Sequence, residues 1–186
     1  QLLWYLLTIK FFKKKYEKVL DIGCGKGDNI KLIKFKKYLG IDINKERIYS
    51  NKKIFKNKNI NFIIHDINKS PYRKDNFDLI LFIQVFTNKY FKEEDMQNTF
   101  DNLFFNFKDE LIFNTSSKTQ KYEESIDYFL KKNKIAYKKI PYGINPYLRK
   151  LKIPIFSQFI SLIYLIWIIL NKKLSKEKIL YLCKKN

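Results

Sequence analysis

The sequence has few of the residues that build metal sites and disulfide frameworks. Its 186 residues include two cysteines, Cys24 and Cys183, and one histidine, His65. So few thiols and imidazoles supply neither a disulfide scaffold nor a four-ligand zinc site, and we predict no metal and a reduced, cytoplasmic setting. A hydrophobic content of 46% excludes a disordered chain, and this length suits a single domain spanning residues 1–186.

Arginine is also scarce, although the chain is strongly basic. All but three of the 38 basic residues are lysine, and the formal net charge is +20. Such a charge is typical of proteins that bind nucleic acid or an anionic membrane surface. The lysines are spread along the chain, however, and the abundant Ile, Asn, Phe and Tyr share AT-rich codons with lysine. Genome composition therefore explains the charge better than a nucleic-acid partner does, and RNA is kept as a less favoured alternative.

Long uncharged runs are rare, and one of them, residues 153–170, has 18 residues. A bilayer-spanning helix needs about 20 apolar residues. Three interpretations stay open: a buried or lid helix, a helix lying at a membrane surface, and a true span. We place this run in an insertion, residues 145–178, before the last strand.

The apolar opening, residues 2–12, lacks the features of a signal peptide. We expect it to form a helix beside the first strand. Because the chain begins at Gln1, further residues can precede it.

Short apolar runs alternate with helical patterns along most of the chain. This alternation predicts a doubly wound α/β fold, Rossmann-like, with a seven-stranded, mostly parallel sheet and helices on both faces. The predicted strands are Lys18–Ile22, Tyr38–Ile43, Ile60–His65, Phe77–Ile83, Glu110–Asn114, Ile135–Ile140 and Ile179–Cys183. The predicted helices are Asp28–Lys37, Lys45–Phe55, Glu93–Phe107 and Tyr122–Asn133.

Three of the five glycines lie at alternate positions directly after the first predicted strand. The run reads Asp21-Ile-Gly23-Cys24-Gly25-Lys-Gly27 and leads into a helix that begins near Asp28. Glycines allow a tight turn and a close approach of a ligand to the backbone. The amino end of the helix adds free N–H groups and a positive dipole. The motif therefore predicts a site for an anionic or zwitterionic group.

The spacing of this loop resembles a known family. It is G-x-G-x-G rather than the dinucleotide pattern G-x-G-x-x-G, and it is similar to motif I of class I S-adenosylmethionine-dependent methyltransferases. Three later segments match the same family: Asp42 with Ile43 after the second strand, Asp66 with Ile67 after the third, and the fourth strand, Phe77–Phe82. The resemblance implies S-adenosylmethionine as cofactor. It implies a binding set of Asp21, Gly23, Cys24, Gly25, Gly27, Asp42, Ile43, Asp66, Ile67 and Phe82, with Asp42 on the ribose hydroxyls.

Each of these residues also has a simpler interpretation. Asp42 is placed where it could cap the following helix, and Asp66 where it could form a turn with Asn68. Cys24 is better explained as a small packing residue than as a nucleophile. His65 is best explained as the end of a strand, because its neighbour Asp66 does not by itself show that the ring faces a cleft.

The catalytic residues are less well defined than the cofactor site. A sulfonium methyl donor is already activated, so positioning of donor and acceptor supplies most of the catalysis and a base is needed only for some acceptors. Gln84, Asn88 and His65 are the candidates, although family members often carry a Glu and a His near the first two positions. The sequence lacks the Asn/Asp-Pro-Pro-aromatic and Pro-Cys signatures of base methylation.

We therefore expect an enzyme that transfers a methyl group from S-adenosylmethionine to a small-molecule or lipid-linked acceptor, with membrane-surface contact through residues 153–170. The alternatives are an RNA methyltransferase, a non-catalytic membrane-associated S-adenosylmethionine-binding homologue, and a different nucleoside-binding α/β enzyme.

Overall fold

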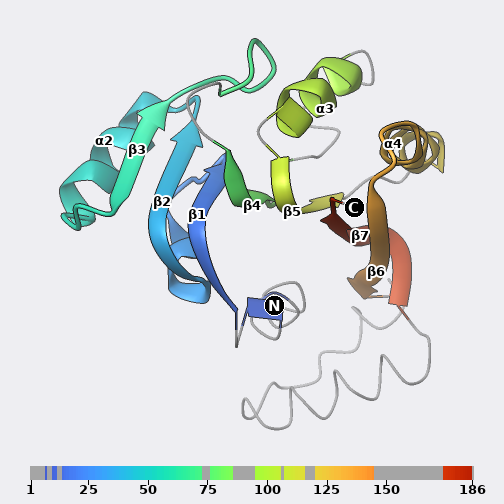
Figure 1. Cartoon of the computed structure of the whole chain (residues 1–186), viewed down its shortest axis with the longest axis horizontal. Helices are drawn as coiled ribbons and strands as arrows, with labels where there is room; N and C mark the ends of the chain where they lie inside the picture. The colour runs from blue at the N-terminus through green and yellow to red at the C-terminus, as the bar shows by residue number, and fades with distance from the viewer. Residues whose placement is uncertain are drawn as a thin grey trace, which may run out of the picture.

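The computed structural model describes residues 7, 10–11, 14–72, 76–85, 95–105, 107–115, 120–144 and 174–185. These residues form a seven-stranded sheet in the order β3-β2-β1-β4-β5-β7-β6 (Figure 1). The strands are β1 (Lys15–Ile22), β2 (Lys34–Asp42), β3 (Ile60–Ile64), β4 (Phe77–Phe82), β5 (Phe107–Thr115), β6 (Ala136–Ile144) and β7 (Leu174–Lys184).

The first five strands run parallel, and β7 runs antiparallel to both of its neighbours. The carboxyl ends of β1 to β5 therefore meet at one edge of the sheet. The strand order reverses at β1, which lies between β2 and β4. Ligands of open α/β sheets bind at such a reversal, beyond the carboxyl ends of the strands. The predicted doubly wound, mostly parallel, seven-stranded sheet is confirmed.

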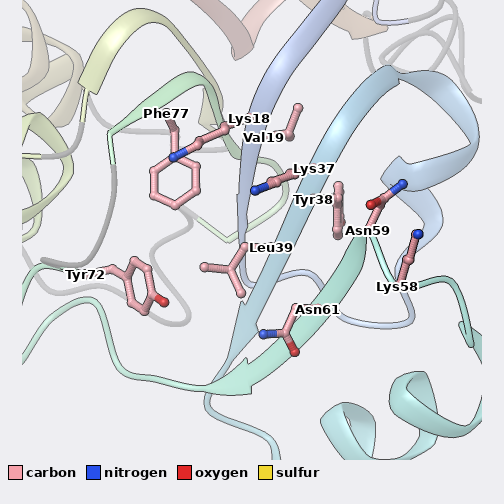
Figure 2. Close-up of a pocket in the computed structure, with 10 residues that line it drawn as sticks. All are labelled: Lys18, Val19, Lys37, Tyr38, Leu39, Lys58, Asn59, Asn61, Tyr72 and Phe77. Atoms are coloured by element: carbon pink, nitrogen blue, oxygen red, sulfur yellow. The ribbon is translucent and has the colours of Figure 1, made fainter.

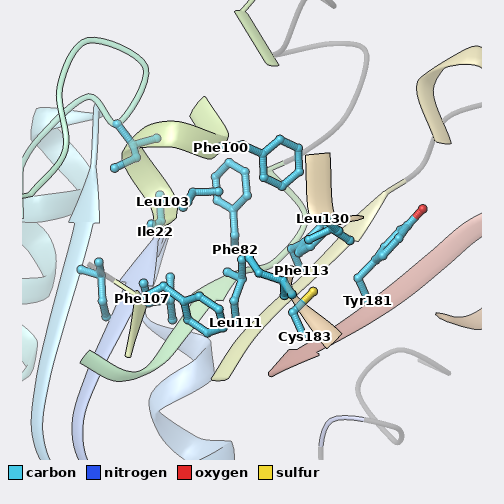
Figure 3. Packing of buried hydrophobic residues seen from close by; sticks show 14 of the residues in the cluster. Ile22, Phe82, Phe100, Leu103, Phe107, Leu111, Phe113, Leu130, Tyr181 and Cys183 are labelled. Carbon is cyan, nitrogen blue, oxygen red and sulfur yellow. The ribbon is translucent and has the colours of Figure 1, made fainter. Parts of the chain in front are cut away.

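Helices cover both faces of the sheet and divide the core into two clusters. Helices α3 (Met96–Phe105) and α4 (Gln120–Lys132) bring Phe100, Leu103 and Leu130 onto one face (Figure 3). On the same face the rings of Phe113 and Tyr181 stack with their centroids 4.6 Å apart. Helix α2 (Lys45–Ile54) packs on the other face, together with residues of the short 3-10 helix that follows the glycine loop. This burial on both faces explains why β4 is almost wholly apolar.

The segment after the glycine loop differs from the prediction. The expected helix Asp28–Lys37 is a 3-10 helix, Asp28–Leu32, and β2 already begins at Lys34. The reason is tertiary: β1 also begins earlier than predicted, at Lys15, and its first residues pair with those of β2. Long-range strand pairing has overridden a local helical pattern.

The carboxyl-terminal hairpin is longer than predicted. β6 continues through Pro141 to Ile144, and β7 begins at Leu174 rather than Ile179. Pro141 is tolerated because β6 is an edge strand of the sheet. Ile144 pairs with Leu174, so the two ends of the intervening segment lie side by side. That segment, which includes the apolar run 153–170 and the predicted insertion, lies outside the described residues. Among the residues that are described, no helix has the length and apolarity needed to cross a bilayer.

The beginning of the chain is tied to β5 by one buried carboxylate. Glu110 Oε1 accepts a hydrogen bond from Lys14 Nζ at 2.7 Å, and Oε2 accepts one from the Tyr16 hydroxyl at 2.8 Å. Lys10 Nζ lies 3.2 Å from the same carboxylate. Burial alone would raise the Glu110 pKa, but the hydrogen bonds from Lys14 and Tyr16 and the nearby charges hold it below its usual value.

We expect Glu110→Gln to destabilise the protein by about 1–3 kcal/mol, because it leaves the buried Tyr16 hydroxyl and two lysines with a poorer acceptor. Glu17→Gln is the matched control, since Glu17 forms an exposed pair with Lys36, and such changes stay within about 0.5 kcal/mol. Chemical denaturation at neutral pH measures both. Since the Glu110 pKa is lowered on folding, its contribution is present above the unfolded value and is lost as the pH falls through the folded one. Equal effects of the two variants would contradict this role.

Candidate functional site

A glycine loop connects β1 to the 3-10 helix at the carboxyl edge of the sheet. Gly23, Gly25 and Gly27 all have left-handed backbone conformations, with φ of 66°, 54° and 77°. The loop is held in place by backbone hydrogen bonds from Cys24 N to Ile41 O at 3.0 Å and from Gly27 N to Cys24 O at 2.8 Å. The alternate glycines of the motif are therefore required by the backbone path.

Two of these glycines have opposite surroundings. A Cβ on Gly23 would lie 2.3 Å from Val85 Cγ2, so the loop after β4 is packed directly against it. Among the described residues, the atom nearest to a Cβ on Gly25 would be the Gly23 carbonyl oxygen, at 4.0 Å. The backbone at Gly25 is thus open on the side from which a ligand would approach.

Asp42 stands at the end of β2 and is hydrogen-bonded to the glycine loop. Its Oδ2 accepts from Gly25 N at 2.9 Å, and its Oδ1 accepts from Asn44 N at 2.9 Å. Asn44, not Asp42, is the N-cap of α2, because its side chain accepts from Arg47 N. Each Asp42 oxygen keeps a second lone pair, so the carboxylate can still accept hydroxyl donors.

Asp21 faces the interior. It is fully buried, and its oxygens accept hydrogen bonds from Asn29 Nδ2 at 3.0 Å and from the Tyr38 hydroxyl. Burial is the main cause that raises its pKa to about 7; the hydrogen bonds from Tyr38 and Asn29 oppose the rise, and the charge of Asp42 adds to it. The bonds of Asp21 join β1, β2 and the 3-10 helix beneath the glycine loop.

The other predicted binding residues divide into exposed and buried ones. Ile43, directly after Asp42, is 68% exposed and offers an apolar surface at the carboxyl edge. Asp66 forms a turn in which its Oδ1 accepts from Asn68 N at 3.1 Å. The side chains of Ile67 and Phe82 belong to the buried core, with exposures of 5% and 0%. Their side chains therefore contribute packing, and only their backbones are placed near the edge.

Cys24 is a buried residue of the loop. Desolvation raises its thiol pKa above the ordinary range, with a further rise from the charges of Asp21 and Asp42. The thiol stays protonated at neutral pH, as expected of a packing residue rather than a nucleophile.

The three candidates for catalysis are placed differently. Gln84 is exposed just beyond β4 and has a left-handed backbone, with φ of 60°, which is uncommon for a residue with a side chain. The His65 ring is turned toward the connection that follows β3: its Nε2 donates to the Ser70 carbonyl at 2.9 Å, and the ring meets Tyr72 edge-on. Asn88 lies outside the described residues.

A buried polar network that the sequence did not reveal holds Gln84. Asn114, near the end of β5, accepts from Gln84 N through Oδ1 at 2.6 Å, and its Nδ2 donates to the Tyr142 hydroxyl on β6 at 2.6 Å. Both side chains are buried. A signal was present, since Asn114 directly follows the apolar run 111–113 of β5, but its partners are 30 and 28 residues away. The network fixes the strained turn that packs on Gly23.

We expect Asn114→Ala to destabilise the protein by about 1–3 kcal/mol, because two buried groups lose their partner. The backbone amide of Gln84 should also lose its protection from hydrogen exchange. Gln97→Ala is the control, since this amide bonds Asp101 on the exposed surface of α3. Denaturation and residue-resolved exchange measure both variants. Unchanged exchange at Gln84 would show that the Val85 contact alone fixes the turn.

The sheet order, the glycine loop and the acid at the end of β2 together form the candidate site at the carboxyl edge of the sheet. The chain matches the family model described as "Methyltransferase domain" over residues 13–141, and it belongs to that family. It is a methyltransferase whose methyl donor is S-adenosylmethionine. A search of curated proteins gave no match.

Solved structures with the same fold are distant in sequence. The methyltransferase domain of bacterial CtHen1 has a TM-score of 0.69 at 15% identity, covering 100% of this chain and 98% of that one. The N-methyltransferase NodS from Bradyrhizobium japonicum, solved with S-adenosylhomocysteine, has a TM-score of 0.66 at 16% identity, covering 99% and 84%. The plantazolicin methyltransferase BpumL, solved with a monoazolic desmethylPZN analog and S-adenosylhomocysteine, has a TM-score of 0.57 at 20% identity, covering 97% and 80%.

Proposed function

We propose that this methyltransferase acts on a small-molecule or lipid-linked acceptor. The acceptor atom is nucleophilic without first losing a proton to the enzyme, as the nitrogen of a neutral amine is. The observation that carries this proposal is the chemistry of the carboxyl edge beyond β4. There the exposed described side chain just beyond β4 is an amide, Gln84, whose backbone is held by the buried amide of Asn114, while the His65 ring is bonded to Ser70. Amides orient an acceptor by hydrogen bonding but take up no proton at neutral pH.

The cofactor part of the proposal assigns a role to three groups of the site: the Asp42 carboxylate, of which 6% is exposed, the Ile43 side chain and the Gly25 backbone. Asp42 accepts from the ribose hydroxyls with its remaining lone pairs, and Ile43 offers its exposed side chain to the adenine ring. The open backbone at Gly25 receives the polar end of the cofactor, close to the amino end of the 3-10 helix. When bound, S-adenosylmethionine supplies an electrophilic methyl group on a positively charged sulfur.

Asp21 has a positioning role in this proposal. Its bonds to Tyr38 and Asn29 hold the strand ends on which the glycine loop and Asp42 are mounted. Gln84, fixed by Asn114, presents its side chain at the point where donor and acceptor meet. Correct placement of two reactants can supply roughly 7–11 kcal/mol of a reaction barrier, so the amide of Gln84, without a strong base beside it among the described residues beyond β4, is compatible with catalysis on an amine-type acceptor.

Two named neighbours support an acceptor of this kind. One is called an N-methyltransferase, and another, called a plantazolicin methyltransferase, was solved with a desmethylPZN analog. Their low identity makes them guides to the choice of substrates rather than evidence for one.

Methyl transfer from labelled S-adenosylmethionine to separated acceptor pools tests the proposal. The pools are polar small molecules rich in amines, lipid extracts and RNA, each incubated with the wild-type chain and with Asp42→Ala. We expect label in a small-molecule or lipid pool, and none with the variant. Label in RNA alone would replace the proposed acceptor by RNA. Binding of S-adenosylhomocysteine without transfer to any pool would favour a non-catalytic homologue.

A further inference from the structure

A chain of hydrogen bonds crosses the sheet from its edge strand to the turn after β4. Its members are the Tyr142 hydroxyl on β6, the Asn114 side chain on β5 and the backbone N–H of Gln84, which together are called the relay below. Both of its bonds measure 2.6 Å. The two side chains are 2% and 8% exposed for Asn114 and Tyr142. Because these groups are shielded from water, the loss of a partner is costly.

The direction of the bonds in the relay is fixed by Gln84. Its group is a backbone N–H, which can only donate, so the oxygen of the Asn114 amide must face it. The NH₂ of the same amide is thereby turned to Tyr142, whose hydroxyl accepts. Rotation of the amide by half a turn would bring two donors together at Gln84. The Tyr142 hydroxyl is therefore the acceptor that Asn114 has in the orientation that binds Gln84.

Tyr142 reaches Asn114 across an intervening strand. β7 lies between β5 and β6, and Leu180 of β7 is the ladder partner of Asn114. Neighbouring strands are about 4.8 Å apart, so β5 and β6 are separated by about 10 Å. The register of β6 on β7 shifts between Pro141 and Gly143, at Tyr142 itself. Such irregularities re-aim a side chain, and this one lies where the tyrosine bonds to β5.

The same tyrosine lies beside the start of the connection between β6 and β7. Because β5 and β6 are both antiparallel to β7, β6 runs in the direction of β5 and ends at the carboxyl edge of the sheet. Ile144 pairs with Leu174, so the connection begins and ends at this edge. The relay therefore links the two ends of this connection to the turn after β4.

The turn that the relay holds is packed on the glycine loop. Gln84 has a φ of 60°, a conformation that costs free energy for a residue with a side chain. The next residue, Val85, lies so close that its Cγ2 would be 2.3 Å from a Cβ on Gly23. If the turn relaxed from its left-handed conformation, Val85 would shift against Gly23. The bond from Gln84 to Asn114 opposes this relaxation.

We infer that Tyr142 is a positioning residue for binding of the methyl donor, acting through Asn114 and Gln84 on the glycine loop. The fraction of chains with the turn in place sets the apparent affinity, because a site that is formed only part of the time binds correspondingly more weakly. This inference rests on the proposed place of the cofactor at the glycine loop. It does not depend on the acceptor, and its test requires no turnover.

A cavity of about 260 Å³ lies elsewhere on the sheet and is separate from the relay. It is lined by residues of β1, β2, β3, the turn before β3 and the connection that follows β3 (Figure 2). Two of them, Lys18 and Lys37, precede the last residues of their strands, Ile22 and Asp42, by four and five positions. The described residues that line it include no member of the relay. The effect of a relay variant on the cofactor is therefore assigned to the turn after β4.

Tyr142→Phe removes one hydroxyl and keeps the ring. It should weaken the binding of S-adenosylhomocysteine by about three- to tenfold, the loss expected for one buried hydrogen bond. Exchange of the Gln84 amide should become faster by a similar factor. Tyr181→Phe is the matched control, because Tyr181 is a buried tyrosine of β7 whose hydroxyl has no hydrogen-bond partner in the described part of the chain. It should leave both quantities unchanged.

Calorimetric titration and residue-resolved hydrogen exchange of the full chain measure these effects. Two further results distinguish a positioning role from a general loss of stability. S-adenosylhomocysteine should slow exchange at Gln84 in the wild-type chain and in Tyr142→Phe, because coupling between binding and ordering is reciprocal. In the Asn114→Ala background, Tyr142→Phe should change neither exchange nor affinity further, since the path between Tyr142 and Gln84 is already broken.

The outcomes separate an error in the relay from an error in the cofactor site. Effects of Tyr142→Phe that equal those of Tyr181→Phe, or that add in full to those of Asn114→Ala, would overturn the inference. If Asn114→Ala does not fold, the comparison of the two tyrosine variants decides. Affinity that Asp42→Ala loses and Tyr142→Phe keeps would show that only the relay is wrong. Affinity that Asp42→Ala also keeps would overturn the proposed cofactor site, and the inference with it.

Discussion

Asp42→Ala should weaken the binding of S-adenosylhomocysteine by at least about 100-fold. The proposed role gives this carboxylate two hydroxyl donors, and a hydrogen bond to a charged group is worth about 1.5–3 kcal/mol. The substitution also removes the acceptor for Gly25 N, so the glycine loop loses the contact that ties it to the end of β2. Calorimetric titration of the wild-type and variant chains measures the difference.

Two further variants show whether the lost affinity belongs to the carboxylate or to a damaged loop. Asp42→Asn keeps one oxygen acceptor at the same place and should weaken binding less, by about tenfold. Asp28→Ala removes an equal charge from an exposed side chain at the start of the 3-10 helix, where it lies 3.7 Å from Lys31, and should change the affinity little. Thermal unfolding monitors the fold of each variant.

Titration of the wild-type chain with S-adenosylhomocysteine tests the cofactor assignment itself. A folded chain that does not bind S-adenosylhomocysteine would contradict the cofactor assignment at this edge of the sheet. Binding that survives Asp42→Ala unchanged would point to a different nucleoside site. Binding by the wild-type chain that is lost in Asp42→Ala would support the cofactor site, and the identity of the acceptor would be the next property to determine.

The fold was predictable because its main signals are local. β4 reads as an apolar run, and the structure buries it between two clusters on opposite faces of the sheet. The misplaced boundaries all depend on distant pairing. Lys34 enters β2 because it is the partner of Lys15, and Pro141 stays in β6 because that strand lies at the edge of the sheet.

The backbone of the candidate site was predictable, but the directions of its side chains were only partly so. The glycine spacing located the turn, and the three left-handed glycines agree with it. The sequence could not show that Phe82 and Ile67 point into the core, because burial depends on which helices cover each face. Nor could it show that Asn114 bonds Gln84 and Tyr142, since these residues come from separate elements.

The stability of the protein should fall as the pH rises from about 4 to about 7, and Asp21 should be the main cause. Burial raises its pKa from the ordinary value of 3.8 to about 7, so between these values the folded chain binds a proton that the unfolded chain has released. Stability then decreases with rising pH, and the loss is complete above about 7. A difference of three pKa units corresponds to a loss of the order of 4 kcal/mol. The carboxylates with lowered pKa, Glu110 and Asp78, act in the opposite sense at lower pH.

Asp21→Asn should remove most of this slope without destroying the site. Asn29 makes this substitution tolerable, because its Oδ1 is buried without a hydrogen-bond partner in the described part of the chain while its Nδ2 donates to Asp21. Rotation of the Asn29 amide by half a turn would present Oδ1 to a donor at position 21, whether that donor is a protonated carboxyl or an amide, and Tyr38 would still donate to the remaining oxygen. Denaturation at pH 5.5 and pH 8 should show a higher wild-type stability at the lower pH and nearly equal values for the variant. If the dependence of stability on pH persists in Asp21→Asn, the titrating group is not Asp21. In that case Asn29→Leu, which removes both the donor to Asp21 and the Asn29 Oδ1 acceptor, would also leave the pH dependence unchanged.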